Sequence, residues 1–214
     1  METEKIKLNT VIISILVIAV IEIIARTLIN TNLIDSLTGL GLARLVEIFF
    51  LLVVVTVREK GLSAIGLKAS GIYRGFIKGL IWAVSFGLAA GVILFIIYLL
   101  GIKLRALFQM QLPFGNRQLT AFFLVGAIIA PVAEEIFFRG ILYGFFRKWG
   151  IPAAIILSTL VFVLSHSSGR TVPVTQIVGG LLFAVAYEVE KNLLVPITIH
   201  ILGNLAIFTL SLIV

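Results

Sequence analysis

Residues 126–140 read GAIIAPVAEEIFFRG and place two carboxylates and an arginine inside a long apolar stretch. Ionisable side chains are costly inside a membrane, so those that occur there are expected to be paired or functional. In the whole chain, 60% of the residues are hydrophobic, only 13% are charged, and the mean hydropathy is +1.19. These values lie far outside those of soluble globular domains. The sequence therefore predicts a polytopic membrane protein.

The hydrophobic pattern divides the chain into apolar segments that suit membrane-spanning helices, each of which needs about twenty residues. We predict an all-α transmembrane helical bundle that forms a single domain over residues 1–214. About seven helices are expected, within a range of six to eight, because two segments are short and one can run on to Phe146. The segments are Val11 to Ile29, Thr38 to Val57, Phe76 to Leu100, Leu119 to Phe138, Ile151 to His166, Val172 to Tyr187 and Leu193 to Val214.

The distribution of charge argues against nucleic acid as a partner. The net charge is +7, but the 17 Lys and Arg residues are scattered singly or in pairs between apolar runs. Most of those in loops fall on the side of the N-terminus, which favours a cytosolic N-terminus. The chain has no cysteine, which excludes disulfides, thiolate metal sites and a cysteine nucleophile. We expect a multi-pass integral protein of the cytoplasmic membrane, in contact with membrane lipid.

Helical periodicity separates the two adjacent carboxylates. Positions four apart share a face of a helix, so Glu135 is expected to pair with Arg139, whereas Glu134 points elsewhere without an intrahelical partner. A buried ion pair compensates two charges at once, and an unpaired carboxylate is a candidate general base. Pro131 is expected to kink the helix because it cannot donate a backbone N–H. The alternative is that both glutamates pair with basic groups and only hold the bundle together.

Both histidines of the chain lie in apolar segments. His166 follows Phe162 by four residues, so the two rings share a helix face. His200 precedes Asn204 by four residues, which places two donors side by side, as a developing oxyanion requires. A single intramembrane histidine is more often an interhelical hydrogen-bonding residue than a catalyst. Three polar clusters in one small bundle nevertheless favour a functional site.

The rise of the α-helix predicts that these residues lie in one layer. Glu134 and His166 lie fourteen and fifteen residues from the turn that joins their helices, or about 21 to 23 Å at the usual rise. His200 and Asn204 lie about 14 and 20 Å from the turn before the last helix. We therefore expect all four side chains to converge.

Taken in order, the three clusters resemble the signatures of the CPBP intramembrane proteases, the family of type II CAAX prenyl endopeptidases and of bacteriocin-processing and self-immunity proteins. The signatures of that family are Glu-Glu-x-x-x-Arg, Phe-x-x-x-His and His-x-x-x-Asn/Asp. They stand here as EEIFFR from Glu134, FVLSH up to His166 and HILGN from His200. The resemblance covers about residues 119–214.

The resemblance implies an intramembrane endopeptidase that hydrolyses a peptide bond of a membrane-associated protein or peptide. In one branch of the family this substrate is a prenylated CAAX protein. The resemblance further implies that Glu134 and His166 activate a water molecule, and that His200 and Asn204 stabilise the tetrahedral oxyanion. The reasoning from the residues alone assigns the same roles. The supporting residues are Glu135, Arg139 and Phe162.

Metal dependence is an open question at this point. Proteins of the family are commonly labelled metalloendopeptidases, and Glu134, His166 and His200 would be the ligands of a zinc ion with water in the fourth position. However, the His-Glu-x-x-His pattern is absent, and the chain has no third histidine. We favour a metal-independent glutamate base without a cofactor, with zinc as the alternative.

Two other classes of function are alternatives to the enzyme. A proton-coupled transporter also places Glu, His and Arg in the bundle interior, but no inverted repeat is apparent, and the polar clusters crowd into the C-terminal half. A non-catalytic membrane scaffold or immunity protein would keep the same residues to bind a partner.

Four further charges lie in apolar segments of the N-terminal half. Glu22 and Arg26 are four residues apart, and Arg44 and Glu47 are three apart, so each couple can pair along its helix or across the two helices. We expect a structural role for them, in which the pairs tighten the packing of the two helices.

Overall fold

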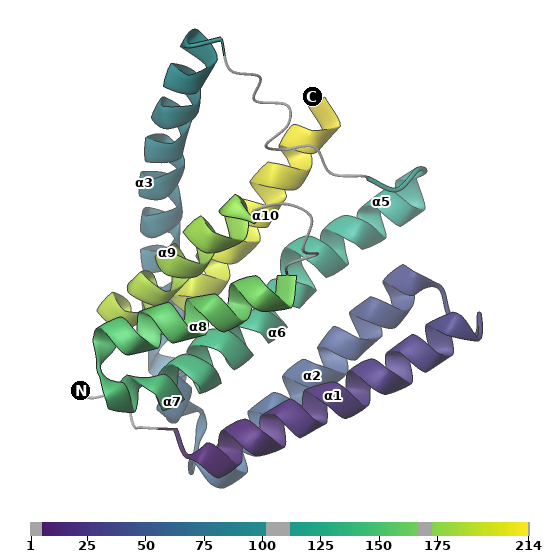
Figure 1. The fold of residues 1–214 in the computed structure, drawn as a ribbon, viewed down its shortest axis with the longest axis vertical. Helices are drawn as coiled ribbons and strands as arrows, with labels where there is room; N and C mark the ends of the chain where they lie inside the picture. The colour runs from purple at the N-terminus through teal and green to yellow at the C-terminus, as the bar shows by residue number, and fades with distance from the viewer. Residues whose placement is uncertain (1–5, 102–111, 167–172, 214) are drawn as a thin grey trace.

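The computed structural model describes residues 6–101, 112–166 and 173–213, and these residues form a bundle of helices without a strand (Figure 1). The first half contains α1 (Leu8–Asn30), α2 (Ser36–Arg58), the short 3-10 turns η1 (Leu62–Ile65) and η2 (Ala69–Gly71), and α3 (Ile72–Leu99). The last three helices are α8 (Ile151–His166), α9 (Val174–Glu190) and α10 (Leu194–Ile213).

Between α3 and α8 lies one continuous helical stretch whose hydrogen-bond pattern changes along its length. Two of its sections are π-helical, which is rare and often found at functional sites. The sections are α5 (Asn116–Phe123), the π-helix η3 (Leu124–Ile129), α6 (Ala130–Glu135), the π-helix η4 (Ile136–Tyr143), α7 (Gly144–Phe146) and the 3-10 turn η5 (Arg147–Trp149).

The predicted all-α transmembrane bundle is confirmed, and the seven helices of the described residues, with the α5–α7 stretch taken as one, follow the predicted segments. Within the described residues, five helices are long and apolar enough to cross a membrane. The other two, α8 with 16 residues and α9 with 17, are the segments that the sequence predicts to be short. The predicted helix start at Val172 and end at Val214 lie outside the described residues. The chain is a multi-pass integral membrane protein.

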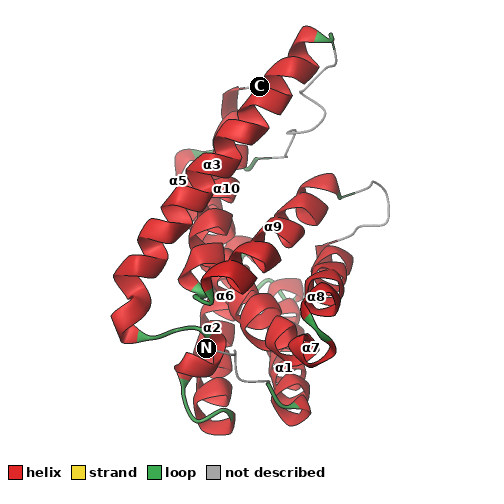
Figure 2. Ribbon diagram, turned by 90° about the vertical axis from the view of Figure 1, so that its left-hand side faces the viewer, coloured by secondary structure: helices red, strands yellow, loops and turns green. Residues whose placement is uncertain are grey.

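The α1–α2 pair lies along one side of the bundle, and α8, α9 and α10 lie on the other side of the α5–α7 stretch (Figure 1). Figure 2, turned by 90°, shows the same helices with the loops that connect them. Helix α2 packs closely on the central stretch at Gly41, which has no side chain. A Cβ atom there would lie 2.9 Å from Val125 Cγ2. This close approach brings the charged residues of α2 near the helix that carries Glu134.

Two glycines allow α3 to lie against the start of α10. A Cβ atom at Gly75 would lie 2.5 Å from Asn192 Oδ1, and one at Gly79 would lie 2.6 Å from Thr198 Cβ. Further along, α3 diverges from α10 (Figure 1), and a Cβ atom at Gly87 would meet nothing within 4 Å. Only the first part of α3 is therefore fitted against the bundle.

We expect Gly79→Ala to destabilise the protein by about 1 to 3 kcal/mol, because the added methyl group must displace Thr198. Gly87→Ala is the matched control in the same helix. It should leave stability unchanged or raise it by up to about 1 kcal/mol, since alanine is the better helix former. Thermal unfolding of both variants in detergent measures the difference. Equal melting temperatures would contradict this account of the α3–α10 contact.

Candidate active site

A fully buried ion pair forms the centre of the site. Glu135 Oε1 accepts a hydrogen bond from Arg139 Nη1 at 2.8 Å, and neither side chain is exposed. The second guanidinium nitrogen, Nη2, donates to the carbonyl oxygen of Gly180 in α9 at 3.2 Å. The ion pair that helical periodicity predicts is therefore present, and it also ties the central stretch to α9.

Two phenylalanine rings flank the guanidinium group of Arg139. Its Cζ atom lies 4.5 Å from the ring centroid of Phe162 in α8 and 5.1 Å from that of Phe183 in α9. At these distances the rings attract the cation and keep it away from solvent. Phe162 thus contacts the buried ion pair, and so does Phe183, which the sequence motifs do not reveal.

His200 is joined to the same carboxylate, which the sequence analysis did not foresee. Its Nδ1 atom lies 2.7 Å from Glu135 Oε1. Because an ionised carboxylate only accepts hydrogen bonds, Nδ1 carries the proton and donates it. The imidazole also stacks on Phe183, with centroids 4.5 Å apart and planes at 22°. No local pattern could have revealed this contact, since the two residues are 65 positions apart.

Glu134 faces both histidines. Its Oε2 atom lies 3.6 Å from His166 Nε2 and 3.8 Å from His200 Nε2. Both distances are too long for a direct hydrogen bond. The Nδ1 atom of His166 donates to the carbonyl oxygen of Phe162 at 2.8 Å, which directs its Nε2 atom towards the carboxylate. Glu134, His166 and His200 thus converge, as the helix rise predicts.

Asn204 lies one turn beyond His200, and its amide is directed towards the central helix. Asn204 Nδ2 donates to the carbonyl oxygen of Gly126 at 3.0 Å. In a π-helical pattern, residue 131 would donate its N–H to the carbonyl of residue 126, but Pro131 has no N–H. The amide of Asn204 therefore satisfies a carbonyl at the irregular section of the helix. An Asn amide has two N–H donors, so the second can serve another acceptor.

The three candidate metal ligands are spaced somewhat more widely around Glu134 than the ligand atoms of a tetrahedral zinc site. In a tetrahedral zinc site with the usual bond lengths, ligand atoms lie about 3.3 Å from one another. The 3.6 and 3.8 Å separations from Glu134 Oε2 exceed this value. Within the described residues, no group of three His, Cys, Asp or Glu side chains is arranged to hold a metal ion. The mechanism proposed below uses the side chains alone, and zinc is the alternative that the metal experiment tests.

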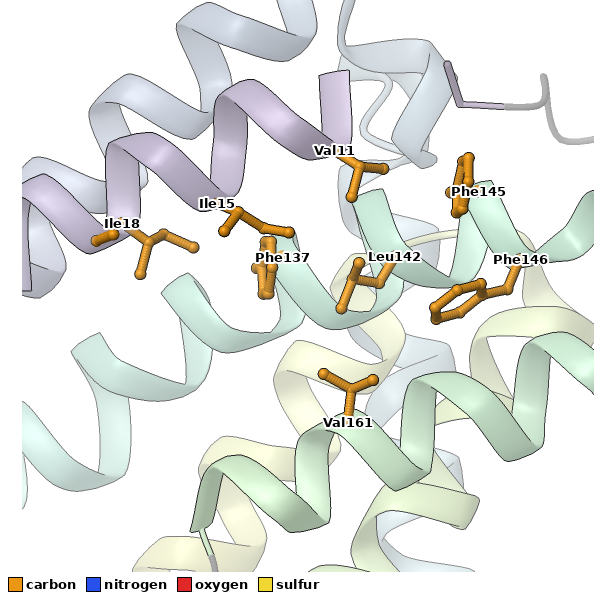
Figure 3. A pocket seen from close by; sticks show the side chains of 9 residues that line it. Val11, Ile15, Ile18, Phe137, Leu142, Phe145, Phe146 and Val161 are labelled. Carbon is orange, nitrogen blue, oxygen red and sulfur yellow. The ribbon is translucent and has the colours of Figure 1, made fainter. Parts of the chain in front are cut away.

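An apolar groove of about 490 Å³ lies apart from these residues, between α1, the η4–α7 section and α8 (Figure 3). Its walls contain no polar side chain, so it offers hydrophobic contact rather than chemistry. None of the candidate catalytic residues lines it. The lining residues are Val11, Ile15, Ile18, Ala19, Phe137, Leu142, Phe145, Phe146 and Val161.

Comparison with known proteins agrees with the resemblance that the three motifs suggest. Residues 116–206 match the family described as type II CAAX prenyl endopeptidase Rce1-like. This segment is similar to that family. It contains all four candidate catalytic residues, together with the Glu135–Arg139 pair and Phe162.

Two bacterial relatives share similarity with the chain. The membrane-embedded CAAX protease MroQ of Staphylococcus aureus (strain USA300) is 34% identical over 41% of this chain and 38% of its own length. YdiL of Bacillus subtilis (strain 168), whose name describes a membrane peptidase, is 29% identical over 42% of this chain and 36% of its own. The matches thus span less than half of each relative. No solved structure matches the chain significantly.

Proposed function

We propose that the protein is an endopeptidase of the cytoplasmic membrane, which hydrolyses a peptide bond of a membrane-associated protein or peptide. The observation that carries the proposal is the convergence of Glu134, His166 and His200 inside a transmembrane bundle, with both Nε2 atoms within 4 Å of one carboxylate oxygen. A transporter or a passive scaffold does not require a carboxylate positioned to activate water. The Rce1-like segment and the two relatives support the same class of activity.

In the proposed reaction, a water molecule lies between Glu134 and His166. Glu134 accepts one proton from the water as its oxygen attacks the carbonyl carbon of the substrate, while His166 accepts a hydrogen bond from the second O–H and orients the nucleophile. The C–N bond of the tetrahedral intermediate then breaks. Glu134 returns its proton to the departing amine, which leaves both residues in their starting state.

His200 and Asn204 are proposed to hold the oxyanion. His200 uses its Nδ1–H on Glu135, so donation to the oxyanion from Nε2 requires a second proton on the imidazole ring. Asn204 contributes the N–H that Gly126 does not use. Donors arranged in advance around a developing negative charge are among the strongest contributions to catalysis.

Hydrolysis is tested with the full chain in proteoliposomes and a farnesylated CAAX peptide, in water enriched in ¹⁸O. We expect cleavage, with one ¹⁸O atom in the new terminal carboxylate, because the nucleophile comes from solvent. An unprenylated peptide of the same sequence tests whether the lipid is required. Failure to cleave either peptide, across a panel of membrane-associated peptides, would contradict the enzyme and favour the scaffold.

The same assay addresses the metal. We expect activity to persist after chelation and to be independent of added zinc, since the side chains alone supply the base and the oxyanion donors. Stoichiometric zinc in the purified protein, together with loss of cleavage on chelation and its recovery with zinc, would replace this mechanism with a zinc-dependent one.

A further inference from the structure

Four charged side chains form one network across α1 and α2. Glu22 Oε1 accepts a hydrogen bond from Arg44 Nη2 at 2.7 Å, and Arg44 Nη1 donates to Glu47 Oε2. Arg26 Nε lies 3.6 Å from Glu22 Oε2. Both predicted intrahelical pairs are therefore present, and the Arg44–Glu22 bond joins them between the helices. The network has no net charge.

The exposure of these side chains falls in order from the end of α1 to the interior. It is 78% for Arg26, 25% for Glu22, 22% for Arg44 and 2% for Glu47. Arg26 lies one turn before the end of α1 at Asn30, near the turn between α1 and α2. The network thus connects a surface of the bundle with its buried face.

The buried end of the network lies near the catalytic carboxylate. Glu47 shares the inner face of α2 with Leu51 and Val55, both of which are buried. This face packs against the central helical stretch. In particular, α2 packs on α6, the section that carries Glu134. The network therefore lies between the end of α1 and the site.

One carboxylate oxygen of the network lacks a hydrogen-bond donor. Glu47 Oε1 is buried and has no hydrogen-bond partner among the described residues. A buried carboxylate oxygen without a partner is strongly unfavourable, and an ordered water molecule is the usual way to satisfy it.

We propose that the Arg26–Glu22–Arg44–Glu47 network binds water and forms the polar route by which water reaches Glu134. The inference rests on the proposed function, because peptide hydrolysis consumes one water molecule per bond. The hydrocarbon region of a membrane provides no water, so a hydrolytic site within that region needs a polar connection to bulk water. The network supplies one, and it is absent from the segment that matches the protease family.

The route is tested by cysteine accessibility, since the chain has no cysteine of its own. Glu47→Cys and Phe49→Cys are compared in membranes with a small cationic methanethiosulfonate that dissolves only in water. Phe49 is 61% exposed on α2, whereas Glu47 is 2% exposed. We nevertheless expect the Glu47→Cys thiol to react about tenfold faster or more, because the reactive thiolate forms only where water is present.

Glu22→Cys is the second variant, for the case that Glu47→Cys fails to fold. It leaves the Arg44–Glu47 pair intact. It should also react faster than Phe49→Cys. If both thiols at network positions react no faster than the thiol at position 49, the route is overturned. Cysteine labelling does not depend on cleavage, so it tests the water route by itself. Failure of the wild-type protein in the ¹⁸O assay would instead overturn the proposed function.

Activity gives an independent measurement. Glu47→Leu should lower kcat about tenfold, equivalent to about 1.4 kcal/mol, with KM unchanged, because water supply and not substrate binding is impaired. Glu47→Gln keeps a second polar atom at this position and should restore most of kcat. A purely structural role predicts instead that kcat follows the melting temperature of the two variants, and that result would overturn the proposal.

Discussion

Glu134→Gln is expected to lower peptide cleavage by roughly 10² to 10⁴-fold, the usual contribution of a general base. The amide has nearly the same shape as the carboxylate but cannot accept the proton of the attacking water. The bundle should remain folded, because the substitution breaks no direct hydrogen bond to the histidines. The Nε2 atoms of His166 and His200 lie 3.6 and 3.8 Å from Glu134 Oε2. Single-turnover cleavage and thermal unfolding of the same preparation measure both quantities.

Glu190→Gln provides the matched control for this variant. Glu190 lies at the end of α9, where it contacts Lys78 Nζ at 3.5 Å and Trp82 Nε1 at 3.2 Å. Its replacement removes a glutamate charge from the bundle without touching the site, so cleavage should stay near the wild-type rate. Undiminished cleavage by Glu134→Gln would exclude this residue as the base and would favour a role for the site in partner binding.

Much of this site follows from local periodicity, which specifies the residues that share one helix face. It predicts the Glu135–Arg139 pair, the contact of Phe162 with His166, and the divergence of Glu134 from its neighbour. The rise per residue then predicts the common depth of Glu134 and the histidines. Periodicity and depth are properties of single helices, so they are available from the sequence.

The contacts between helices could not be predicted in the same way. The rotation of α10 about its axis decides whether His200 meets Glu134 or Glu135, and only packing fixes it. In the structure, the Nδ1 atom of His200 contacts Glu135, and its Nε2 atom faces Glu134. The bond from Asn204 to Gly126 likewise depends on π-helical turns near Pro131, which no apolar pattern indicates.

The second large effect is expected at Arg139. Arg139→Met should destabilise the protein by about 3 to 5 kcal/mol, because it leaves the carboxylate of Glu135 buried without its main counter-charge. Methionine fills a similar volume, so the loss reports charge and hydrogen bonding more than an empty cavity. The carbonyl of Gly180 also loses its donor, at a further cost. Unfolding in detergent, by heat or by denaturant, measures the change.

A double-mutant cycle measures the interaction free energy of Glu135 and Arg139 separately from their other contacts. Glu135→Gln with Arg139→Met should destabilise less than the sum of the two single variants, because the second change removes the charge that the first leaves unpaired. Arg139→Lys keeps the charge but lacks the planar fork that binds Glu135 and Gly180 together, so its stability should lie between wild type and Arg139→Met. Additive effects would mean that the two charges do not stabilise each other. In that case the position of His200, which depends on the same carboxylate oxygen as Arg139, would need another source of order.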